Sequence, residues 1–357
     1  MKPMLLSIGQ LAAASLFTFM TAGCSDNDNK GGAVQEPLAD TKTYYTNPVI
    51  GPDTPDPTVI KADDGYFYLY NTGGNCYFDR SKDLVNWEFL GTAFTEEDKP
   101  AWEPDAGIWA PDINYINGKY VLYYAMSKWG GGATCGIGVA VADTPTGPFT
   151  DLGKLFRSNE IDVHNSIDPF YIEDNGKKYL FWGSWWGIWG VELTEDGLAL
   201  AGGIEQAKAN KFQVAWGSEG TDSYEAPYIL KRGDYYYLFC STGTCCDGLN
   251  STYTTVVARS TSLFGPYVNA EGKSMLEGRN HEVVILKNED FVGTGHNAEI
   301  VQDDAGNDWI IYHAYVAGVD QGRVICLDRL YWDEDGWPYV LGNGPAVKAE
   351  APVFNNK

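Results

Sequence analysis

The sequence predicts an all-β fold, a five-bladed β-propeller, because one unit recurs five times along the chain. In each copy an acidic or polar residue opens an apolar stretch, and a turn then leads into an alternating strand rich in aromatic residues. The first residues of the five copies lie 56, 56, 57 and 71 positions apart and are Asp56, Asp112, Asp168, Glu225 and His296. Sheets that repeat about every 50 to 60 residues are typical of propeller blades.

The turns of the repeat predict β-hairpins. Asn117-Gly118 separates two strand-like stretches in the second copy, and Asp174-Asn175-Gly176 does so in the third. Asn-Gly and Asp-Gly are the strongest short-range hairpin signals, because these residues accept the positive φ of a tight turn. No helical periodicity long enough to compete appears after the N-terminal segment, which supports the all-β class.

The composition limits the class of partner. The chain has 357 residues, a net charge of −23, 12 Trp and 23 Tyr. A surface this acidic repels phosphate backbones, which argues against a nucleic-acid partner. Flat aromatic rings stack on the apolar faces of sugars, and a neutral sugar is not repelled by acidic surface. The composition therefore favours a secreted protein that handles carbohydrate.

The first 23 residues resemble a bacterial lipoprotein signal. Lys2 precedes a mostly apolar stretch that ends in Thr21-Ala22-Gly23-Cys24, with small residues just before the cysteine. We expect a lipid on Cys24, a flexible linker over residues 24–43 and the propeller over residues 44–357. The polar, acidic residues after Cys24 resemble a surface-export tag. They indicate an outer-membrane lipoprotein at the cell surface. We expect a monomer whose contact with the membrane is the lipid anchor. A periplasmic location and a plain secretory signal are the alternatives.

The remaining cysteines do not form a disulfide scaffold. Six are spread over most of the chain without a C-x-x-C pair: Cys76, Cys135, Cys240, Cys245, Cys246 and Cys326. We expect most of them to be buried free thiols. The adjacent pair Cys245-Cys246 leaves two states open, a pair of thiols or a disulfide between neighbours.

The repeat also predicts an axial site. The innermost strand of each blade lines the propeller axis, so residues at the same point of each copy face one pocket; strand capping is the alternative for any one of them. Two carboxylates that flank a sugar bond suffice for glycoside hydrolysis, one as acid and one activating water or attacking carbon. Crowded like charges raise one pKa, which keeps the acid protonated. Trp109 and Trp185 lie near these carboxylates in the sequence and could stack on sugar or belong to the core.

With these motifs the sequence resembles family 43 glycoside hydrolases, five-bladed propellers that hydrolyse furanosides and xylosides with inversion. Pro55-Asp56-Pro57 matches the family's general-base motif, and Glu225-Ala-Pro-Tyr228 matches its general-acid motif. Asn165-Ser-Ile-Asp168-Pro169 matches the motif whose aspartate tunes and orients the acid. Inversion implies that the carboxyl groups of Asp56 and Glu225 lie roughly 6.5–9.5 Å apart. For Asp112 three roles stay open: bonding the base, holding water or capping its strand.

Further segments narrow the resemblance to the endo-α-1,5-L-arabinanases: Cys245 through Tyr253, Gly293-Thr-Gly-His296-Asn297, and Asp328 through Trp332 with Gly336-Trp-Pro338. In those enzymes the histidine of the second segment stands at an axial metal ion, usually calcium. The resemblance therefore implies a calcium ion or other cation near His296, and arabinan as the polysaccharide substrate. The expected sugar-binding residues are Trp109, Asn165, Ser166, Ile167, Gly183, Ser184 and Trp185.

Two features keep other activities open. Pro55 stands where arabinanases commonly have His and is closer to the exo-acting members, and the Gly-rich segment 128–134 falls where the cleft wall would be. An exo-acting α-L-arabinofuranosidase or a β-xylosidase of the same family is the enzymatic alternative. The non-enzymatic alternative is a sugar-binding propeller, which has no need of a second acid across the pocket. The sequence has no G-x-S-x-G elbow, and Ile285 interrupts the one H-E-x-x-H candidate, which argues against a serine hydrolase and a zincin.

Overall fold

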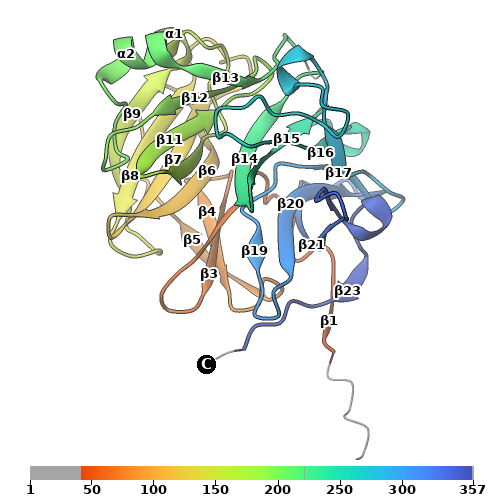
Figure 1. The fold of residues 1–357 in the computed structure, drawn as a ribbon. Coiled ribbons are helices and arrows are strands. Elements are labelled where there is room, and N and C mark those ends of the chain that lie inside the picture. Colours follow the sequence, from red (N-terminus) through yellow and green to blue (C-terminus); the bar gives the residue numbers. More distant parts are fainter. Residues whose placement is uncertain (1–41, 221, 356–357) are drawn as a thin grey trace, which may run out of the picture. The chain divides into compact units, whose positions relative to one another are not determined.

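The computed structural model describes residues 42–220 and 222–355 (Figure 1). The predicted signal, the lipidation site Cys24 and the linker up to residue 41 lie outside the described residues. In the part of the chain that the structure describes, no helix has the length and apolar character needed to cross a membrane. The described chain is built from short antiparallel strands with little helix, which confirms the all-β class.

The first three copies of the repeat form three separate four-stranded antiparallel sheets, each with its strands in chain order. The first sheet holds β2 (Thr58–Lys61), β3 (Phe67–Asn71), β4 (Tyr77–Ser81) and β5 (Trp87–Thr92). The second holds β6 (Gly107–Ile116), β7 (Lys119–Ser127), β8 (Gly136–Ala142) and β9 (Thr150–Arg157). The third holds β10 (Phe170–Asp174), β11 (Lys177–Trp182), β12 (Ile188–Glu192) and β13 (Phe212–Ala215).

The fourth and fifth copies form two groups of strands that share one nine-stranded sheet. The fourth group comprises β14 (Glu225–Arg232), β15 (Tyr235–Thr242), β16 (Thr254–Ser260) and β17 (Glu282–Ile285). The fifth comprises β18 (Phe291–Gly295), β19 (Val301–Gln302), β20 (Asp308–Val316), β21 (Val324–Trp332) and β22 (Pro338–Tyr339). The single parallel pair Thr254–Thr294, between β16 and β18, joins the two groups.

Strands from the two ends of the described chain pair with each other. β1 (Tyr44–Thr46) runs antiparallel to β23 (Lys348–Glu350). The helical elements are short and lie in connections: α1 (Ser158–Ile161), α2 (Gly203–Asn210) and the 3₁₀ turns η1 (Gly248–Asn250), η2 (Met275–Glu277) and η3 (Leu341–Asn343).

The predicted hairpins are confirmed. Asn117 and Gly118 join β6 to β7 with φ angles of 50° and 83°, and Asn175 and Gly176 join β10 to β11 with 50° and 76°. Two consecutive residues with positive φ are the signature of a type I′ turn, which matches the twist of the strands it connects. The Asn-Gly pattern therefore fixed these turns through backbone chemistry alone.

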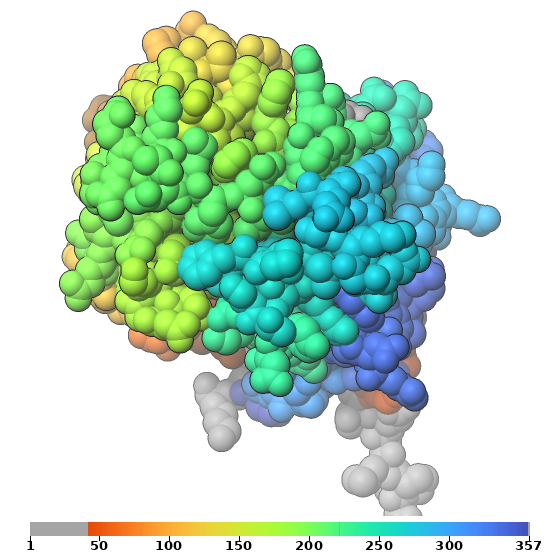
Figure 2. All heavy atoms as spheres, turned by 45° about the horizontal axis from the view of Figure 1, so that its top comes forward, coloured from red at the N-terminus to blue at the C-terminus, as the bar shows by residue number. Residues whose placement is uncertain are grey.

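Apolar and aromatic side chains fill the spaces between consecutive sheets. The segments coloured yellow, green and cyan, which follow one another in the chain, pack directly against each other (Figure 2). Apolar residues of the last group of strands, Ile311 and Leu327, belong to one buried cluster with Phe67 and Leu69 of the first sheet. Ring pairs cross three of the other boundaries: Tyr70 with Phe149, Phe156 with Trp182, and Phe170 with Tyr228.

Hydrogen bonds near the inner strands also link each sheet to the next one in chain order, and they form a closed cycle. At each boundary a side chain of one sheet accepts from a backbone amide of the next, and the last contact returns to the first sheet. The donor and acceptor pairs are Ala110 N to Thr72 Oγ1 (2.7 Å), Tyr171 N to Asp112 Oδ2 (2.8 Å), Ala226 N to Asp168 Oδ2 (3.2 Å), His296 N to Ser241 Oγ (2.8 Å) and Asp56 N to His313 Nδ1 (3.1 Å).

Asn47 ties the start of the described chain to its end. Its buried amide group donates to the carbonyl oxygens of Leu327 (3.0 Å) and Ala346 (2.9 Å) and accepts from the amide of Leu327 (2.9 Å). A buried backbone group left without a partner costs about 1–3 kcal/mol. This side chain therefore holds together two segments that are 280 positions apart.

Replacing Asn47 with alanine should lower the free energy of unfolding by about 2–4 kcal/mol, because the amide of Leu327 and the carbonyl of Ala346 lose this partner inside the fold, while the carbonyl of Leu327 keeps the hydroxyl of Tyr45. Denaturant unfolding followed by tryptophan fluorescence measures the change. Asn210→Ala, at an exposed position on α2, is the matched control and should stay within about 0.5 kcal/mol of the parent. Equal stability of the Asn47 and Asn210 variants would contradict the closing role of Asn47.

Candidate active site

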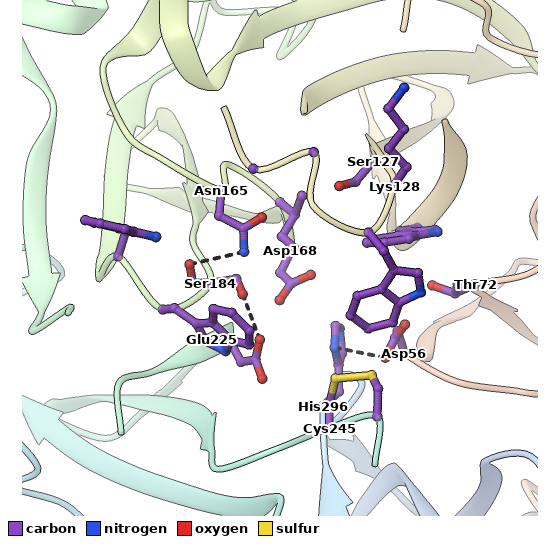
Figure 3. A pocket seen from close by; sticks show the side chains of 18 of the residues that line it. Asp56, Thr72, Ser127, Lys128, Asn165, Asp168, Ser184, Glu225, Cys245 and His296 are labelled. Atoms are coloured by element: carbon purple, nitrogen blue, oxygen red, sulfur yellow. Dashed lines mark hydrogen bonds and ion pairs between the residues drawn. A yellow bond between two sulfur atoms is a disulfide. The ribbon is translucent and has the colours of Figure 1, made fainter. Parts of the chain in front are cut away.

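One cavity collects the three predicted carboxylates (Figure 3). Asp56 precedes β2, Asp168 precedes β10, and Glu225 begins β14, so each comes from a different sheet. Six more of the predicted site residues line the same cavity: Trp109, Asn165, Ile167, Ser184, Trp185 and His296. The fold therefore brings together side chains that lie far apart in the sequence.

Ser166 and Gly183, also predicted to bind sugar, are not among the residues that line the cavity. Ser166 is fully buried; its hydroxyl donates to the carbonyl oxygen of Val163 and accepts from the indole of Trp182. Gly183 has a φ of 143°, and a Cβ there would lie 2.1 Å from the carbonyl oxygen of Gly187. Both residues support the cavity wall from behind.

Asp56 is held in its ionised form. Nη1 of Arg323 lies 2.9 Å from Oδ1 of Asp56, and the Nδ1 atoms of His296 and His313 lie 3.4 and 3.2 Å from the same oxygen. Burial opposes ionisation, but the positive charge of Arg323 outweighs it and holds the pKa of Asp56 well below its usual range. Burial lowers the pKa of His313 to about 4, so at neutral pH His313 is uncharged and Arg323 supplies the positive charge.

Glu225 is in the opposite state. Burial, and then the negative charge of Asp56, raise the pKa of Glu225 to about 7. The hydroxyl of Ser184 donates to Oε2 at 2.7 Å, which favours the ionised form and limits the rise (Figure 3). Oε1 is buried and has no hydrogen-bond partner among the described residues. Tyr253, which lines the same cavity, likewise favours the ionised form of Glu225 and limits the rise.

Asp168 interacts with both of the other carboxylates. Burial, followed by the charges of Glu225 and Asp56, raises the pKa of Asp168. Its Oδ2 accepts from the amide of Ala226, the residue after Glu225, at 3.2 Å. Asp168 therefore fixes the backbone that carries Glu225 and adds to the electrostatic cost of ionising it.

At one equivalent position in each repeat, the backbone at the site is held in the left-handed region. These residues and their φ angles are Asp56 (56°), Ala110 (39°), Asp168 (59°), Ala226 (54°) and His296 (49°). All but the last precede a proline, a position that disfavours helical φ and ψ. Such conformations cost about 1–3 kcal/mol each and persist where surrounding structure fixes them, commonly at functional sites.

These φ angles correct the predicted alignment of the five repeat copies. The residue equivalent to Asp56 and Asp168 is Ala110 in the second copy and Ala226 in the fourth, not Asp112 or Glu225. The pairing of β6 with β7 and of β14 with β15 is irregular at these points, which displaces the acidic residues by two positions and by one. Glu225 still lines the main cavity, whereas Asp112 does not.

Asp112 lies in a smaller cavity behind the site, together with Glu299. Burial, and then the charge of Glu299, raise the pKa of Asp112 well above its usual value, and burial raises that of Glu299 to about 7. Asp112 accepts from the amide of Tyr171, and Glu299 accepts from the amide of Val59. This contact is none of the three roles left open for Asp112: the carboxylate binds a backbone amide of β10 and so links its strand to the next sheet.

Aromatic side chains form the rim of the main cavity. Trp109 and Trp129 are in contact, with ring centroids 5.6 Å apart, and Trp129 is 75% exposed. His164 packs edge-on against Trp186 at 4.9 Å on another part of the lining. Nε1 of Trp185, in the same wall, is buried without a partner among the described residues. The lining therefore offers apolar faces and one unused hydrogen-bond donor.

The adjacent cysteines are joined in a disulfide. Cys245 and Cys246 form one bond, and both line the main cavity. The other four cysteines of the described chain are buried free thiols, as predicted: Cys76, Cys135, Cys240 and Cys326.

The donors around His296 fit a cation that is coordinated mostly by water. His296 lines both cavities, and burial lowers the pKa of its imidazole, which leaves it neutral and able to ligate. The side-chain oxygen of Asn297 lines the smaller cavity and has no partner among the described residues. Within those residues no three His, Cys, Asp or Glu side chains form a metal-binding group. Calcium takes six to eight oxygen ligands, so water would have to supply most of them.

The residues of the site that were not predicted include Arg323, His313, Tyr253 and Trp129. Arg323 precedes β21 and His313 lies within β20, neither in a motif that the repeat singles out. Trp129 follows Lys128 in the glycine-rich segment that was expected to form the cleft wall, so its position carried a usable signal. Tyr253 stands in the quoted segment after the two cysteines and stacks on His313 at 5.5 Å.

The sequence profile of glycosyl hydrolases family 43 matches residues 45–338. The chain belongs to this family. The profile covers all five copies of the repeat and every carboxylate described above. A family 43 enzyme is a glycoside hydrolase, and the two carboxylates in opposite protonation states are the groups that such chemistry requires.

Family 43 relatives of known activity cover most of the chain. An extracellular exo-α-(1→5)-L-arabinofuranosidase of Cellvibrio japonicus is 36% identical over 306 residues, which are 81% of this chain and 86% of the relative. An extracellular endo-α-(1→5)-L-arabinanase of Bacillus subtilis is 33% identical over 294 residues, 79% of this chain and 86% of the relative. Among solved structures, Cellvibrio cellulosa α-L-arabinanase complexed with arabinohexaose matches with a TM-score of 0.72 and 33% identity, over 81% of this chain and 95% of that one.

The pKa of Glu225 predicts the alkaline limit of activity. An acid must be protonated to act, so kcat/KM should fall above pH 7 or so, while the low pKa of Asp56 keeps the acidic limit below the usual Asp range. Ser184→Ala removes a bond to the ionised form of Glu225, which raises its pKa and should move the alkaline limit up by about one pH unit. Profiles of kcat/KM against pH measure the shift. Ser127→Ala, the same change elsewhere in the lining, should leave it in place; an unmoved limit in Ser184→Ala would contradict the assignment.

Proposed function

We propose that this family 43 enzyme hydrolyses the α-1,5-L-arabinofuranosyl linkages of arabinan with inversion, and that it acts within the chain. The observation that carries the proposal is the pair of carboxyl groups in one cavity with opposite protonation states. Asp56 is ionised beside Arg323, and Glu225 is protonated near neutral pH with one oxygen unpartnered. A sugar-binding protein without turnover has no use for this division.

The proposed reaction is a single displacement. Asp56 removes a proton from a water molecule, the water oxygen attacks the anomeric carbon, and Glu225 donates its proton to the departing glycosidic oxygen. The products are a sugar with inverted anomeric configuration and a shortened chain with a free hydroxyl. Asp168 orients Glu225 through the amide of Ala226 and keeps its pKa high. A neutral His313 accepts from the amide of Asp56 and fixes the backbone of the base.

The sugar-binding residues are proposed from the lining. Trp109 and Trp185 offer flat faces, and the free Nε1 of Trp185 offers a donor to a sugar hydroxyl. Asn165 and Ile167 face the cavity on the segment that leads into Asp168. An arabinofuranosyl unit would provide hydrogen-bond partners for Nε1 of Trp185 and Oε1 of Glu225, the two unpartnered polar atoms of the wall. This would explain why neither atom has a partner within the protein.

Arabinan is proposed because the relatives of known activity act on α-1,5-linked arabinose. The B. subtilis relative acts as an endo enzyme and the C. japonicus relative as an exo enzyme. Trp109, Trp129 and Trp186 line the cavity together with the carboxylates, and these three apolar faces favour binding of several sugar units and hence the endo mode. An exo-acting arabinofuranosidase, which Pro55 favours, is the competing function. Release of short oligosaccharides from linear arabinan indicates the first; release of a single fixed product from the chain end indicates the second.

We also propose a five-bladed propeller, in which the three four-stranded sheets and the two groups of strands that share the nine-stranded sheet are the blades. The cycle of hydrogen bonds and the pairing of β1 with β23 support it. For the cell, we propose a monomer anchored to the outer membrane through lipid on Cys24, with the site facing extracellular polysaccharide. The extracellular location of two relatives is consistent with export.

A calcium ion or similar cation is proposed beside His296, with Asn297 as a further ligand and water completing the shell. When bound, such an ion would supply positive charge on the axis of the molecule. Every step of the proposed reaction is carried out by side chains of this chain.

Glu225→Gln tests the acid by its dependence on the leaving group. With linear debranched arabinan, kcat should fall by about 10²–10⁴-fold, because the alkoxide leaving group needs a proton. With an aryl arabinofuranoside whose phenol is already a good leaving group, the loss should be far smaller. Asp56→Asn, which removes the base, is the matched control and should impair both substrates alike. Proton NMR of the first product reads inversion directly. Equal losses on both substrates in Glu225→Gln would contradict the acid assignment.

Trp129→Ala tests the extended rim. Stacking of an aromatic ring contributes about 0.5–1.5 kcal/mol beyond burial, so kcat/KM on long arabino-oligosaccharides should fall by about three- to tenfold. The aryl arabinofuranoside, with one sugar unit, should react as before. Tyr115→Ala, which removes another exposed aromatic ring away from the cavity, is the control and should change neither substrate. A loss that is independent of chain length would place Trp129 outside the substrate-binding rim.

A further inference from the structure

We propose that the Cys245–Cys246 disulfide is a substrate-contacting wall of the active site, whose reduction weakens substrate binding without unfolding the protein. The proposal rests on the proposed function, because the ligand it contacts is the furanose unit next to the bond that is cleaved. Both cysteines are half-buried and line the cavity that holds Asp56 and Glu225. Figure 3 draws the disulfide, with Cys245 labelled, in the same cavity as His296 and Asp56.

The loop that carries the disulfide is fixed at its base. It connects β15 to β16, and Thr244 and Thr252 face each other across its neck. The amide of each donates to the hydroxyl of the other at 3.0 Å, and the two hydroxyls are 3.1 Å apart. The hydroxyl of Ser251 donates to the carbonyl oxygen of Thr244, and the 3₁₀ turn η1 fills the tip. The two sulfurs are therefore held at one place in the cavity.

A disulfide between neighbouring residues contributes little to global stability. Disulfides stabilise mainly by closing long loops in the unfolded chain, and the benefit falls as the loop shortens. Here the sequence separation is one residue, so the unfolded chain is barely restricted. The bond instead removes the free rotation of two side chains, and within the described chain neither sulfur takes part in a hydrogen bond. Its effect is on the local shape and polarity of the wall.

The sulfur surface suits the C–H face of a furanose ring. Two covalently joined sulfurs are polarizable and apolar, and they make dispersion contacts with carbon. Trp109 and Trp185, which also line the cavity, offer apolar faces of the same kind. Two separate thiols would be free to rotate, would carry S–H groups, and would occupy more volume than the bonded pair. Reduction therefore changes the shape and the polarity of a wall that the substrate contacts.

Reduction with tris(2-carboxyethyl)phosphine is a selective probe. The phosphine takes its oxygen from water and becomes the phosphine oxide; the S–S bond breaks, and the two electrons and two protons convert the disulfide to two thiols. Among the described residues Cys245–Cys246 is the bond available for this reaction, and the other four cysteines are buried thiols already. Labelling of the native protein should show two more reactive thiols per chain after treatment.

Kinetics on an arabino-oligosaccharide, with and without the phosphine, test the proposal. The reduced enzyme should show KM raised about tenfold with kcat within twofold, and a melting temperature within about 2 °C of the oxidised form. The double variant Cys245→Ser/Cys246→Ser should resemble the reduced enzyme and should not respond to the phosphine. Cys76→Ala, which removes a buried thiol that does not line the cavity, should respond as the parent does.

The outcomes separate this proposal from the proposed function. Turnover by the oxidised enzyme with identical KM in the reduced enzyme and the serine variant overturns the disulfide's role and leaves the hydrolase intact. A large fall in melting temperature on reduction would also overturn it, since it would make the bond a structural staple. If the oxidised enzyme shows no turnover of arabinan, the hydrolase proposal fails; calorimetric Kd values for the same oligosaccharide in the two redox states then decide the disulfide's role, equal values refuting it.

Discussion

The cycle of side chain-to-amide hydrogen bonds between successive sheets is the constraint on which the site depends. Each sheet is a small antiparallel unit that could not hold a catalytic geometry alone. Because an amide next to the cavity is bound by the preceding sheet, the sheets are placed relative to one another at the point where the chemistry occurs. Two of the five acceptors act beside the proposed acid and base: Asp168 binds the amide of Ala226, the residue after Glu225, and His313 binds the amide of Asp56.

The left-handed residues before proline make that geometry specific. Asp56 and Asp168 stand at these positions themselves, while Ala226 follows Glu225 directly. A relaxed backbone would take an extended conformation before proline and would direct the side chains elsewhere. At Asp56 and Ala226 this cost is offset by the hydrogen bond that the residue's own amide makes to the neighbouring sheet. The strained backbone, the contacts between sheets and the positions of the carboxylates therefore depend on one another.

Much of this was predictable from the sequence, because hairpin turns and the repeat are local signals. Asn117-Gly118 fixed a turn through backbone preference, and the spacing of acidic residues found the three carboxylates that share the main cavity. The alignment of the copies was wrong at Asp112, because irregular strand pairing shifts an acidic residue along the chain. Aligning the copies on the prolines would have corrected it: Pro57, Pro111, Pro169 and Pro227. Arg323 carries no such signal, since its role comes from a charge brought to Asp56 across 267 positions. The state of Cys245-Cys246 likewise depends on geometry that composition does not contain.

The opposite states of Asp56 and Glu225 follow from where the one facing guanidinium lies. Both carboxyls are buried, and burial alone would protonate both. Arg323 is in contact with Asp56, so its positive charge stabilises mainly the ionised form of that residue. The ionised Asp56 then repels a second negative charge on Glu225 or Asp168. The assignment of roles is therefore a consequence of one contact. Moving the cation to Glu225 would ionise the acid and neutralise the base, and the same three carboxylates could no longer carry out hydrolysis by this route.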